Sequence, residues 1–247
     1  MLRKYRKEKV VGKGAFGSAI LVERIVDGKK CIIKKVSLAK VPPKEQKEAE
    51  QEALLLSRVS HPNIVAYLES FVEARALCIV MEFADGGDLE RFLRDRRGRY
   101  LSEERVQDWF VQLCLAMKHL HDRKVLHRDL KPANVFLACS QRVLKVGDLG
   151  IARVLAHTLE QARTMCGTPY YMSPEVCREE RYGDRSDMWA LGCVLYEMCA
   201  LRHAFTGQNM RDLFRRINRG AFSPIPEHYS SEVQGLVARL LAPDPRR

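Results

Sequence analysis

Apolar positions in the first third of the chain form short runs that alternate with polar positions, a pattern typical of β-strands. The stretch ILVERIVDGKKCIIKKV (20–36) has two such runs on either side of Asp27-Gly28, and Asp-Gly between apolar runs is a strong hairpin signal. Two later stretches, IVAYLESFV (64–72) and ALCIVMEF (76–83), have the same character. The pattern therefore predicts a β-rich first part.

One helix is expected inside this β-rich part. The stretch PPKEQKEAEQEALLLSRV (42–59) begins with proline and places Ala49, Ala53, Leu56 and Val59 at helical spacing. Proline is favoured at the first position of a helix, where its missing N–H has no partner to lose.

The pattern changes after the turn-rich FADGGD (83–88), and the rest of the chain is mainly helical. LSEERVQDWFVQLCLAMKHLHDR (101–123) repeats its apolar residues at helical spacing behind Ser102, a suitable N-cap. DMWALGCVLYEMCAL (187–201) is apolar on nearly all sides, which predicts a buried helix. We therefore predict an α+β chain with a small β-rich lobe over 1–81, a junction over 82–87 and a larger helical lobe over 88–247.

Composition places the chain among globular proteins without a membrane span. Of its 247 residues, 46% are hydrophobic and 30% charged, and no apolar stretch approaches 18 residues. The start, MLRKYRKEKV, is not followed by an apolar segment, so no secretory signal is expected. Eight cysteines form no C-x-x-C pair, which favours reduced thiols over a metal site.

The net charge of +11 favours anionic partners. The densest basic run, RFLRDRRGRY (91–100), has five arginines, but few aromatic residues lie between them, which is less typical of nucleic-acid binding. We interpret it as a solvated helix end and expect no DNA or RNA partner.

The first candidate site is the glycine-rich VVGKGAFGSA (10–19), with Gly12, Gly14 and Gly17. This spacing also occurs in dinucleotide-binding turns, but there a helix follows. Here the next residues continue as a strand, so the stretch predicts a loop between two strands whose backbone N–H groups cover phosphates, and a merely flexible hairpin is the alternative.

A second candidate is the pair Lys34 and Lys35 in CIIKKV (31–36). A lysine within an apolar strand needs an anionic partner or access to solvent. The two point to opposite faces, and alternation alone does not decide which of them faces a site. Glu52, on the apolar stripe of the expected helix, is a candidate partner; a surface salt bridge is the alternative.

The most specific motif is HRDLKPANVFL (127–137), which combines Asp129, Lys131 and Asn134 within eleven residues. Asp129 can accept a hydroxyl proton, Lys131 can stabilise a phosphoryl group, and Asn134 offers an amide oxygen to a metal. Asp148, in KVGDLGIAR (145–153), lies fourteen residues later. Asp148 and Asn134 are therefore predicted to hold Mg²⁺ together with nucleotide phosphates.

These motifs, in this order, resemble the signature of protein kinases. GTPYYMSPE (167–175) is similar to the end of a kinase activation segment, and SDMWALGCVLYEM (186–198) to the buried helix whose Asp187 braces the catalytic loop. HPNIV (61–65), MEFADGGDL (81–89) and RTMCGTPYYMSPE (163–175) look most like the NIMA-related Ser/Thr kinases. The resemblance covers nearly the whole chain and implies the two-lobed kinase fold.

The resemblance also implies roles for individual residues. It makes Lys34 the ATP-phosphate lysine paired with Glu52, Asp129 the catalytic base assisted by Lys131, and Asn134 and Asp148 the Mg²⁺ ligands. The implied nucleotide-binding residues are Val11, Gly12, Gly14, Gly17, Ala19, Ile32, Lys34, Met81, Glu82, Phe83, Ala84 and Phe136.

Regulation by phosphorylation is a further expectation from the resemblance. Thr164 occupies a position phosphorylated in many NIMA-related kinases, and a phosphate there adds roughly −1.5 to −2 charges. Arg128 and Arg153 are the candidate partners of this phosphate. Thr168 fits the Ser/Thr class, and an unmodified, solvated Thr164 is the alternative.

The sequence departs from the family pattern at several places. Leu149 replaces the usual Phe after Asp148, which keeps the carboxylate, and Ala19 and Ile32 reshape the nucleotide pocket. The chain stops at LLAPDPRR, before the arginine expected to pair with Glu175, so we expect an incomplete C-terminal end.

Two functions follow from these expectations. The first is a Ser/Thr kinase that uses ATP and Mg²⁺ and acts on Ser/Thr residues of protein substrates. The alternative is a kinase-shaped regulatory module that is weak or inactive because of truncation. We expect a cytoplasmic protein without membrane attachment and with a cytoskeletal or ciliary association; the sequence does not indicate its substrate, activator or oligomeric state.

Overall fold

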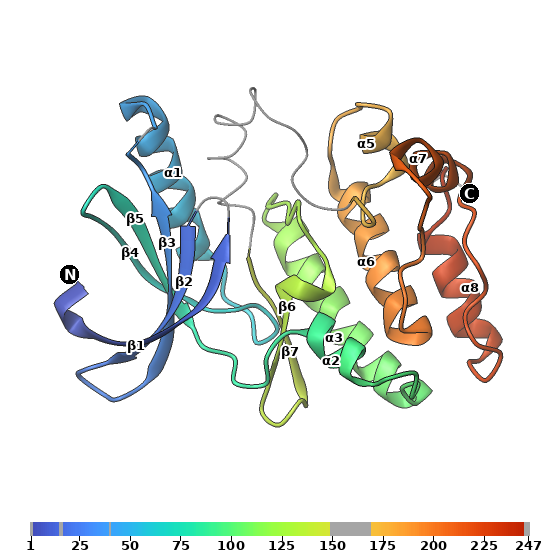
Figure 1. Ribbon diagram of the computed structural model, residues 1–247, viewed down its shortest axis with the longest axis horizontal. Helices are drawn as coiled ribbons and strands as arrows, with labels where there is room; N and C mark the ends of the chain where they lie inside the picture. The colour runs from blue at the N-terminus through green and yellow to red at the C-terminus, as the bar shows by residue number, and fades with distance from the viewer. Residues whose placement is uncertain (1, 15–16, 40, 149–168, 245–247) are drawn as a thin grey trace. The chain divides into compact units, whose positions relative to one another are not determined.

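The computed structural model describes residues 2–14, 17–39, 41–148 and 169–244 (Figure 1). These residues divide into two compact units. We call residues 2–85 the N-terminal unit and residues 86–244 the C-terminal unit.

The N-terminal unit is a five-stranded antiparallel sheet with one long helix beside it (Figure 1). After the short 3₁₀ helix η1 (Leu2–Lys4), the strands have the order β1-β2-β3-β5-β4. Their bounds are β1 (Tyr5–Gly14), β2 (Gly17–Arg24), β3 (Lys30–Ser37), β4 (Tyr67–Glu73) and β5 (Ala76–Glu82). The helix α1 spans Pro43–Leu55 and is followed by the 3₁₀ helix η2 (Leu56–Arg58).

The predicted hairpin around Asp27-Gly28 is confirmed as the β2–β3 pair. Its connection is longer than a two-residue turn, and Gly28 has a φ of 67°, a left-handed conformation that glycine adopts without strain. At the other end of the pair, a Cβ on Gly17 would lie 1.9 Å from the Lys35 carbonyl oxygen. Only glycine therefore allows β2 to approach β3 this closely.

One face of the sheet carries a buried hydrophobic cluster, and residues at the start of the chain pack against it. Val22, Cys31, Ile33, Phe71, Cys78 and Val80 form a buried cluster, against which Leu2, Tyr5 and Ile20 pack. Because side chains alternate along a strand, the residues between these positions in β2, β3 and β5 lie on the opposite face.

The C-terminal unit is mainly helical and contains one small two-stranded sheet (Figure 1). Its elements are α2 (Leu89–Asp95), α3 (Glu103–Asp122), η3 (Pro132–Asn134), β6 (Val135–Ala138), β7 (Val143–Val146), α5 (Pro174–Cys177), α6 (Asp184–Ala200), α7 (Met210–Arg219) and α8 (Ser231–Leu240).

Helix α6 is the centre of this unit and packs against α3 and α8. Every residue from Trp189 to Ala200 is buried, as the apolar sequence predicted. Helix α3 begins as expected at Ser102, whose side chain accepts a hydrogen bond from the Arg105 backbone N–H. The apolar stripe of α3 is buried between α6 and the β6–β7 hairpin.

The expected β-rich lobe and helical lobe are thus confirmed. The helix predicted from Pro42 begins at Pro43, and Ala49 and Ala53 are fully buried. In the described part of the chain, no helix is long and apolar enough to cross a membrane. The cysteines that the structure describes are all free thiols.

Candidate active site

The loop between α3 and β6 is held by His127, whose side chain is completely buried. The His127 Nδ1 atom accepts a hydrogen bond from the Asp129 backbone N–H at 3.2 Å, and Nε2 lies 3.0 Å from the Gly147 carbonyl oxygen. Nε2 must therefore carry the proton and donate it to Gly147, which fixes the neutral tautomer. Burial lowers the pKa of His127, in agreement with an uncharged ring.

Asp187, near the start of α6, supports the same loop through hydrogen bonds to its backbone. Its fully buried carboxylate accepts hydrogen bonds from the backbone N–H groups of His127 and Arg128, at 2.9 and 3.0 Å. Arg128 has a φ of 66°, a strained conformation for a residue with a side chain. The bond to Asp187 helps to hold that conformation.

Asp187 has two more partners, which the sequence analysis did not identify. His121 Nε2 lies 2.8 Å from one carboxylate oxygen, and the Tyr182 hydroxyl donates to the other at 2.5 Å. His121 lies only six positions before His127 in the sequence, which was a weak indication that it could contact the same carboxylate. Nothing local in the sequence indicated Tyr182.

One carboxylate oxygen of Asp129 is contacted by both Lys131 and Asn134. Lys131 Nζ lies 2.9 Å from Asp129 Oδ2, and Asn134 Nδ2 donates to the same oxygen at 2.9 Å. Asn134 Nδ2 also donates to the Asp129 carbonyl oxygen at 2.7 Å. The Asp129 side chain is 45% exposed, so its carboxylate is oriented by the chain and still reachable by a substrate.

The β6–β7 hairpin brings Asp148 to this cluster. Val135 pairs with Val146 at the open end of the hairpin, and the Gly147 N–H donates to the Asn134 carbonyl oxygen at 2.9 Å. Asp148 follows directly, with a φ of 56°. The structure thus places Asp148 beside Asn134, fourteen residues away in sequence.

In the N-terminal unit, the sheet register places Lys34 on a face with other predicted nucleotide-binding residues. Lys34 pairs directly with Ala19 of β2, and Ile32 pairs with Met81 of β5. Directly paired residues share a face, as do residues two apart on a strand, so these four side chains share one face. Lys35 lies opposite Cys78, on the face of the buried cluster.

The glycine-rich stretch forms the adjoining ends of β1 and β2. Gly12 pairs with Ala19 and Gly14 with Gly17, and a register shift between Val10 and Gly12 marks a bulge at Val11. The two strands expected on either side of the loop are therefore paired, and residues 15 and 16 between them lie outside the described part of the chain.

The remaining predicted residues lie in both units. Glu52 belongs to α1, but its side chain is outside the described part of the structure. Glu82 is fixed at the end of β5 by two hydrogen bonds with the Ala66 backbone, at 2.9 and 3.1 Å. Phe83 and Ala84 follow it and are half-buried, and Phe136 lies on β6 in the C-terminal unit.

Several expectations concern residues that the structure does not describe. Leu149, Arg153, Thr164 and Thr168 all lie outside the described ranges. Arg128 is described, and its side chain is exposed. Glu175, expected to lack a partner, accepts a hydrogen bond from the Ser186 hydroxyl at 2.5 Å.

A second polar cluster, also missed in the sequence, joins the segment after residue 168 to α6. The Tyr171 hydroxyl donates to Glu197 Oε2 at 2.8 Å, and His203 Nδ1 lies 3.2 Å from the same oxygen. Tyr170 stacks on the His203 ring with centroids 4.1 Å apart. The hydrogen bond to Glu197 raises the pKa of His203.

The side-chain oxygen atoms of Asn134 and Asp148 are of the kind that bind a hard cation such as Mg²⁺. Both Asn134 Nδ2 hydrogen bonds go to Asp129, which orients the amide with Oδ1 as its acceptor. One carboxylate and one amide oxygen, completed by phosphate oxygens and water, is a typical Mg²⁺ environment. No group of three or more His, Cys, Asp or Glu able to hold a metal occurs among the described residues.

Comparison with known proteins identifies the family. The model of the protein kinase domain matches residues 5–247. The chain belongs to the protein kinase family. Its similarity to Nek proteins over nearly the whole chain also confirms the predicted resemblance to NIMA-related Ser/Thr kinases.

Three relatives illustrate how far the similarity of this kinase domain extends. It is 46% identical over 245 residues to serine/threonine-protein kinase Nek1 of Mus musculus, which covers 99% of the chain and 20% of the relative. It is 46% identical over 243 residues to Nek5 of Homo sapiens, with 98% and 34% covered. With nekl-2 of Caenorhabditis elegans the identity is 41%, with 96% and 69% covered. The chain thus spans between a fifth and a third of the first two relatives.

Proposed function

We propose that this kinase domain transfers the γ-phosphoryl group of ATP to Ser or Thr hydroxyls of protein substrates. The observation that carries the proposal is the convergence of Lys131 and Asn134 on the Asp129 carboxylate, with Asp148 held beside Asn134 through Gly147. Membership of the kinase family and similarity to Ser/Thr kinases support it.

Asp129 acts as the base that orients and accepts the proton of the substrate hydroxyl. Two donors on Oδ2 hold its carboxylate in one orientation, and its partial exposure leaves it accessible. A positioned base contributes about 10²- to 10⁴-fold to the rate. Lys131, 2.9 Å from Asp129 Oδ2, places a positive charge where negative charge develops during transfer.

The other groups bind and orient the nucleotide. Asn134 and Asp148 would hold Mg²⁺, which when bound neutralises charge on the phosphate oxygens. Lys34, paired with Glu52, would bind the phosphates below the backbone N–H groups of Gly12, Gly14 and Gly17. The adenine-binding residues would be Val11, Ala19, Ile32, Met81, Glu82, Ala84 and Phe136.

Activation by phosphorylation of Thr164 is part of the same proposal, with Arg128 and Arg153 as partners of the phosphate. Thr168 would contribute to selection of Ser/Thr substrates. For the whole protein we infer protein substrates rather than nucleic acids, and a cytoplasmic site with cytoskeletal or ciliary association.

The test is transfer of labelled phosphate from ATP with Mg²⁺ to a generic Ser/Thr protein substrate by residues 1–247. We expect transfer by the unchanged chain and a loss of at least about 100-fold for Asp129→Asn, with a comparable loss for Asp148→Asn. Asp95→Asn, on the exposed end of α2, is the matched control and should retain activity.

The alternative function, a regulatory module without catalysis, gives a different result. A chain that folds and binds ATP but transfers no phosphate would support it and contradict the proposal. Circular dichroism and thermal unfolding of each variant separate this outcome from a failure to fold.

A further inference from the structure

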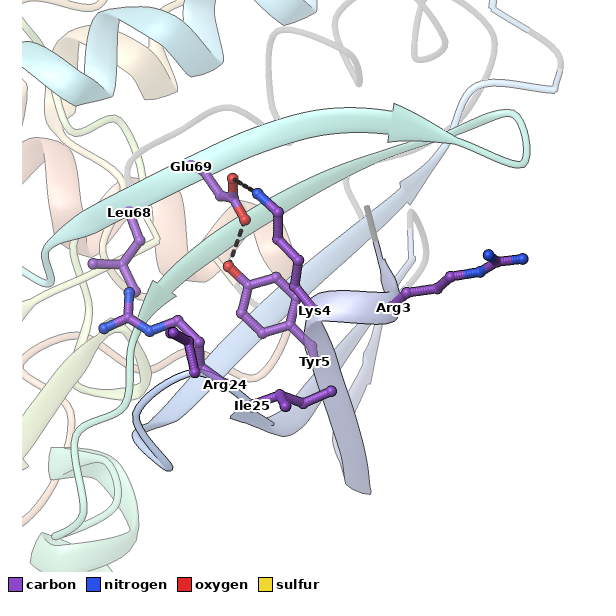
Figure 2. A pocket seen from close by; sticks show the side chains of 8 residues that line it. Arg3, Lys4, Tyr5, Arg24, Ile25, Leu68 and Glu69 are labelled. Carbon is purple, nitrogen blue, oxygen red and sulfur yellow. Dashed lines mark hydrogen bonds and ion pairs between the residues drawn. The ribbon is translucent and has the colours of Figure 1, made fainter.

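Two basic surfaces of the chain differ in how far nearby acids match their charges. On the N-terminal unit, Lys4 Nζ lies 3.5 Å from Glu69 Oε2, and the Tyr5 hydroxyl donates to the same carboxylate (Figure 2). Arg24 forms a bidentate pair with Asp27 in the same region. These cations are paired within the fold, so they do not select a partner from outside.

The C-terminal unit has a basic surface at the end of α2 that is not matched in this way. We call the exposed side chains of Arg91, Arg94, Arg97 and Arg99 the arginine patch. In the described part of the chain, the one carboxylate within ion-pair distance of the patch is that of Asp95, 3.7 Å from Arg91 Nε and 3.9 Å from Arg94 Nε. Four guanidinium groups therefore face a single carboxylate.

Other acids near α2 are engaged by different groups. Asp88 caps the start of α2 through a side-chain oxygen that accepts a backbone N–H at 2.8 Å. The Glu103 carboxylate accepts hydrogen bonds from the Ser230 backbone N–H and hydroxyl, both at 2.6 Å. Glu90 acts electrostatically on the His203 ring. Within the described residues, none of these three acids forms an ion pair with the arginine patch.

The loop that carries Arg97 and Arg99 is held in one conformation by Arg96. Arg96 Nε donates to the Arg99 carbonyl oxygen at 2.8 Å, and Nη2 donates to the Tyr100 carbonyl oxygen at 3.0 Å. The Arg96 guanidinium also lies over the Phe92 ring, 5.9 Å from its centroid. The backbone that presents the patch is thus ordered in advance, which lowers the entropy cost of binding a partner.

The fold itself gains little from the arginine patch. A cation in the last turn of a helix interacts favourably with the free carbonyl groups, which accounts for Arg94, but Arg97 and Arg99 lie beyond that turn. The ion pairs with Asp95 are weak, because the Arg91 and Arg94 side chains are 73% and 68% exposed. Neighbouring cations also repel one another. An anion bound from outside would relieve this repulsion.

We propose that the arginine patch is a docking site for an acidic segment of a partner protein, with Glu or Asp side chains spaced along an extended chain. Planar guanidinium groups bind carboxylates through two parallel hydrogen bonds. Asp95 lies among the arginines and would repel a continuous row of phosphates, which disfavours a nucleic acid or an anionic lipid surface. This function is independent of phosphoryl transfer.

The probe is a fluorescein-labelled ten-residue peptide in which Glu alternates with Ser. Two matched peptides carry Gln or Lys in place of Glu. Fluorescence anisotropy with residues 1–247 measures affinity, and amide chemical shifts locate the bound peptide. We expect the Glu peptide alone to bind, with shifts at Gly98 and Tyr100 and an affinity that falls as salt is added, because exposed charges are screened.

Variants with matched charge changes separate the patch from the general charge of the chain. Arg97→Gln/Arg99→Gln should weaken binding about tenfold or more, because two charge-assisted contacts are lost. Asp95→Asn removes the acid that competes with the peptide and should strengthen binding roughly twofold or more. Lys7→Gln/Lys9→Gln is the control, since it removes the same charge from exposed positions of β1 and should change affinity far less.

Several results would overturn the proposal. These are equal affinity for the Glu and Gln peptides, an equal loss with Lys7→Gln/Lys9→Gln, shifts confined to residues outside 89–100, or no gain in affinity with Asp95→Asn. Because Asp95→Asn is expected to increase affinity, a loss of folding cannot imitate its result. Binding of an oligouridylate or of phosphatidylserine vesicles that the double arginine variant abolishes, without peptide binding, would assign the patch to a nucleic acid or a lipid surface instead.

Discussion

Replacing Asp187 with Asn should weaken the support of the loop between α3 and β6. Each carboxylate oxygen of Asp187 accepts from one backbone N–H, that of His127 or Arg128. An Asn side chain has one acceptor oxygen, so one of these buried N–H groups must face an NH₂ group. An unsatisfied buried donor costs about 1–3 kcal/mol, and bonds to a charged acceptor are roughly twice as strong as neutral ones. We expect a loss of about 2–4 kcal/mol in the free energy of unfolding.

For a chain of this length, that loss corresponds to a decrease in Tm of roughly 5–15 °C. Urea and thermal unfolding measure it, and hydrogen exchange reports the amides of His127 and Arg128 directly. Exchange at one of these amides should accelerate more than exchange at the centre of α6, because the defect is local.

Asp184→Asn is the control, since it removes the same charge from the first turn of the same helix at an exposed position. It should leave the amides of His127 and Arg128 protected. If Asp187→Asn and Asp184→Asn had equal free energies of unfolding and equal exchange rates at the His127 and Arg128 amides, the hydrogen bonds from these amides to Asp187 would not have the energetic role that we assign to them.

Three further predictions follow. Ser173 is buried, and its hydroxyl has no hydrogen-bond partner among the described residues, so Ser173→Ala should leave stability unchanged or raise it by about 1 kcal/mol in urea unfolding; a clear loss would show that the hydroxyl has a partner. Gly17→Ala should lower Tm because its Cβ would lie 1.9 Å from the Lys35 carbonyl oxygen, whereas Gly12→Ala meets nothing closer than 3.8 Å and should be tolerated; equal effects would contradict this reading of the β2–β3 approach. The pKa of His203 is raised by Glu197, and Glu90 also acts on the ring. The pairing of protonated His203 with Glu197 therefore stabilises the fold fully below the ordinary histidine pKa of about 6.5. This contribution is lost as the pH rises through the raised pKa of His203. Urea unfolding of wild type and His203→Gln across this pH range should show a difference that shrinks with rising pH, and a constant difference would refute the assignment.

Local signals were sufficient to predict most elements of the fold. Helix α3 follows from apolar residues at helical spacing behind Ser102, and the β2–β3 hairpin from two apolar runs around Asp27-Gly28. These signals work because capping, turn conformation and side-chain periodicity depend on residues close together in sequence.

Features that depend on distant residues were not predictable from local pattern. Strand alternation could not decide between Lys34 and Lys35, and the resemblance to kinases supplied that choice before the register of β2, β3 and β5 placed Lys34 with Ala19. Tyr171 meets Glu197 across 26 positions. The bulge at Leu68 depends on pairing with β5, which no local pattern reports.

Helix α6 carries two of the supports described above at a fixed separation. Asp187 holds the loop between α3 and β6, and Glu197 holds Tyr171; the two lie ten positions apart, which corresponds to about 15 Å of helix. From Trp189 to Ala200 this helix has no exposed residue, so it cannot bend or slide without opening the core of the unit. The loop between α3 and β6 and the Tyr170–Tyr171 segment are therefore both anchored to the same rigid helix. A substitution that displaces α6 should displace the loop and the segment together.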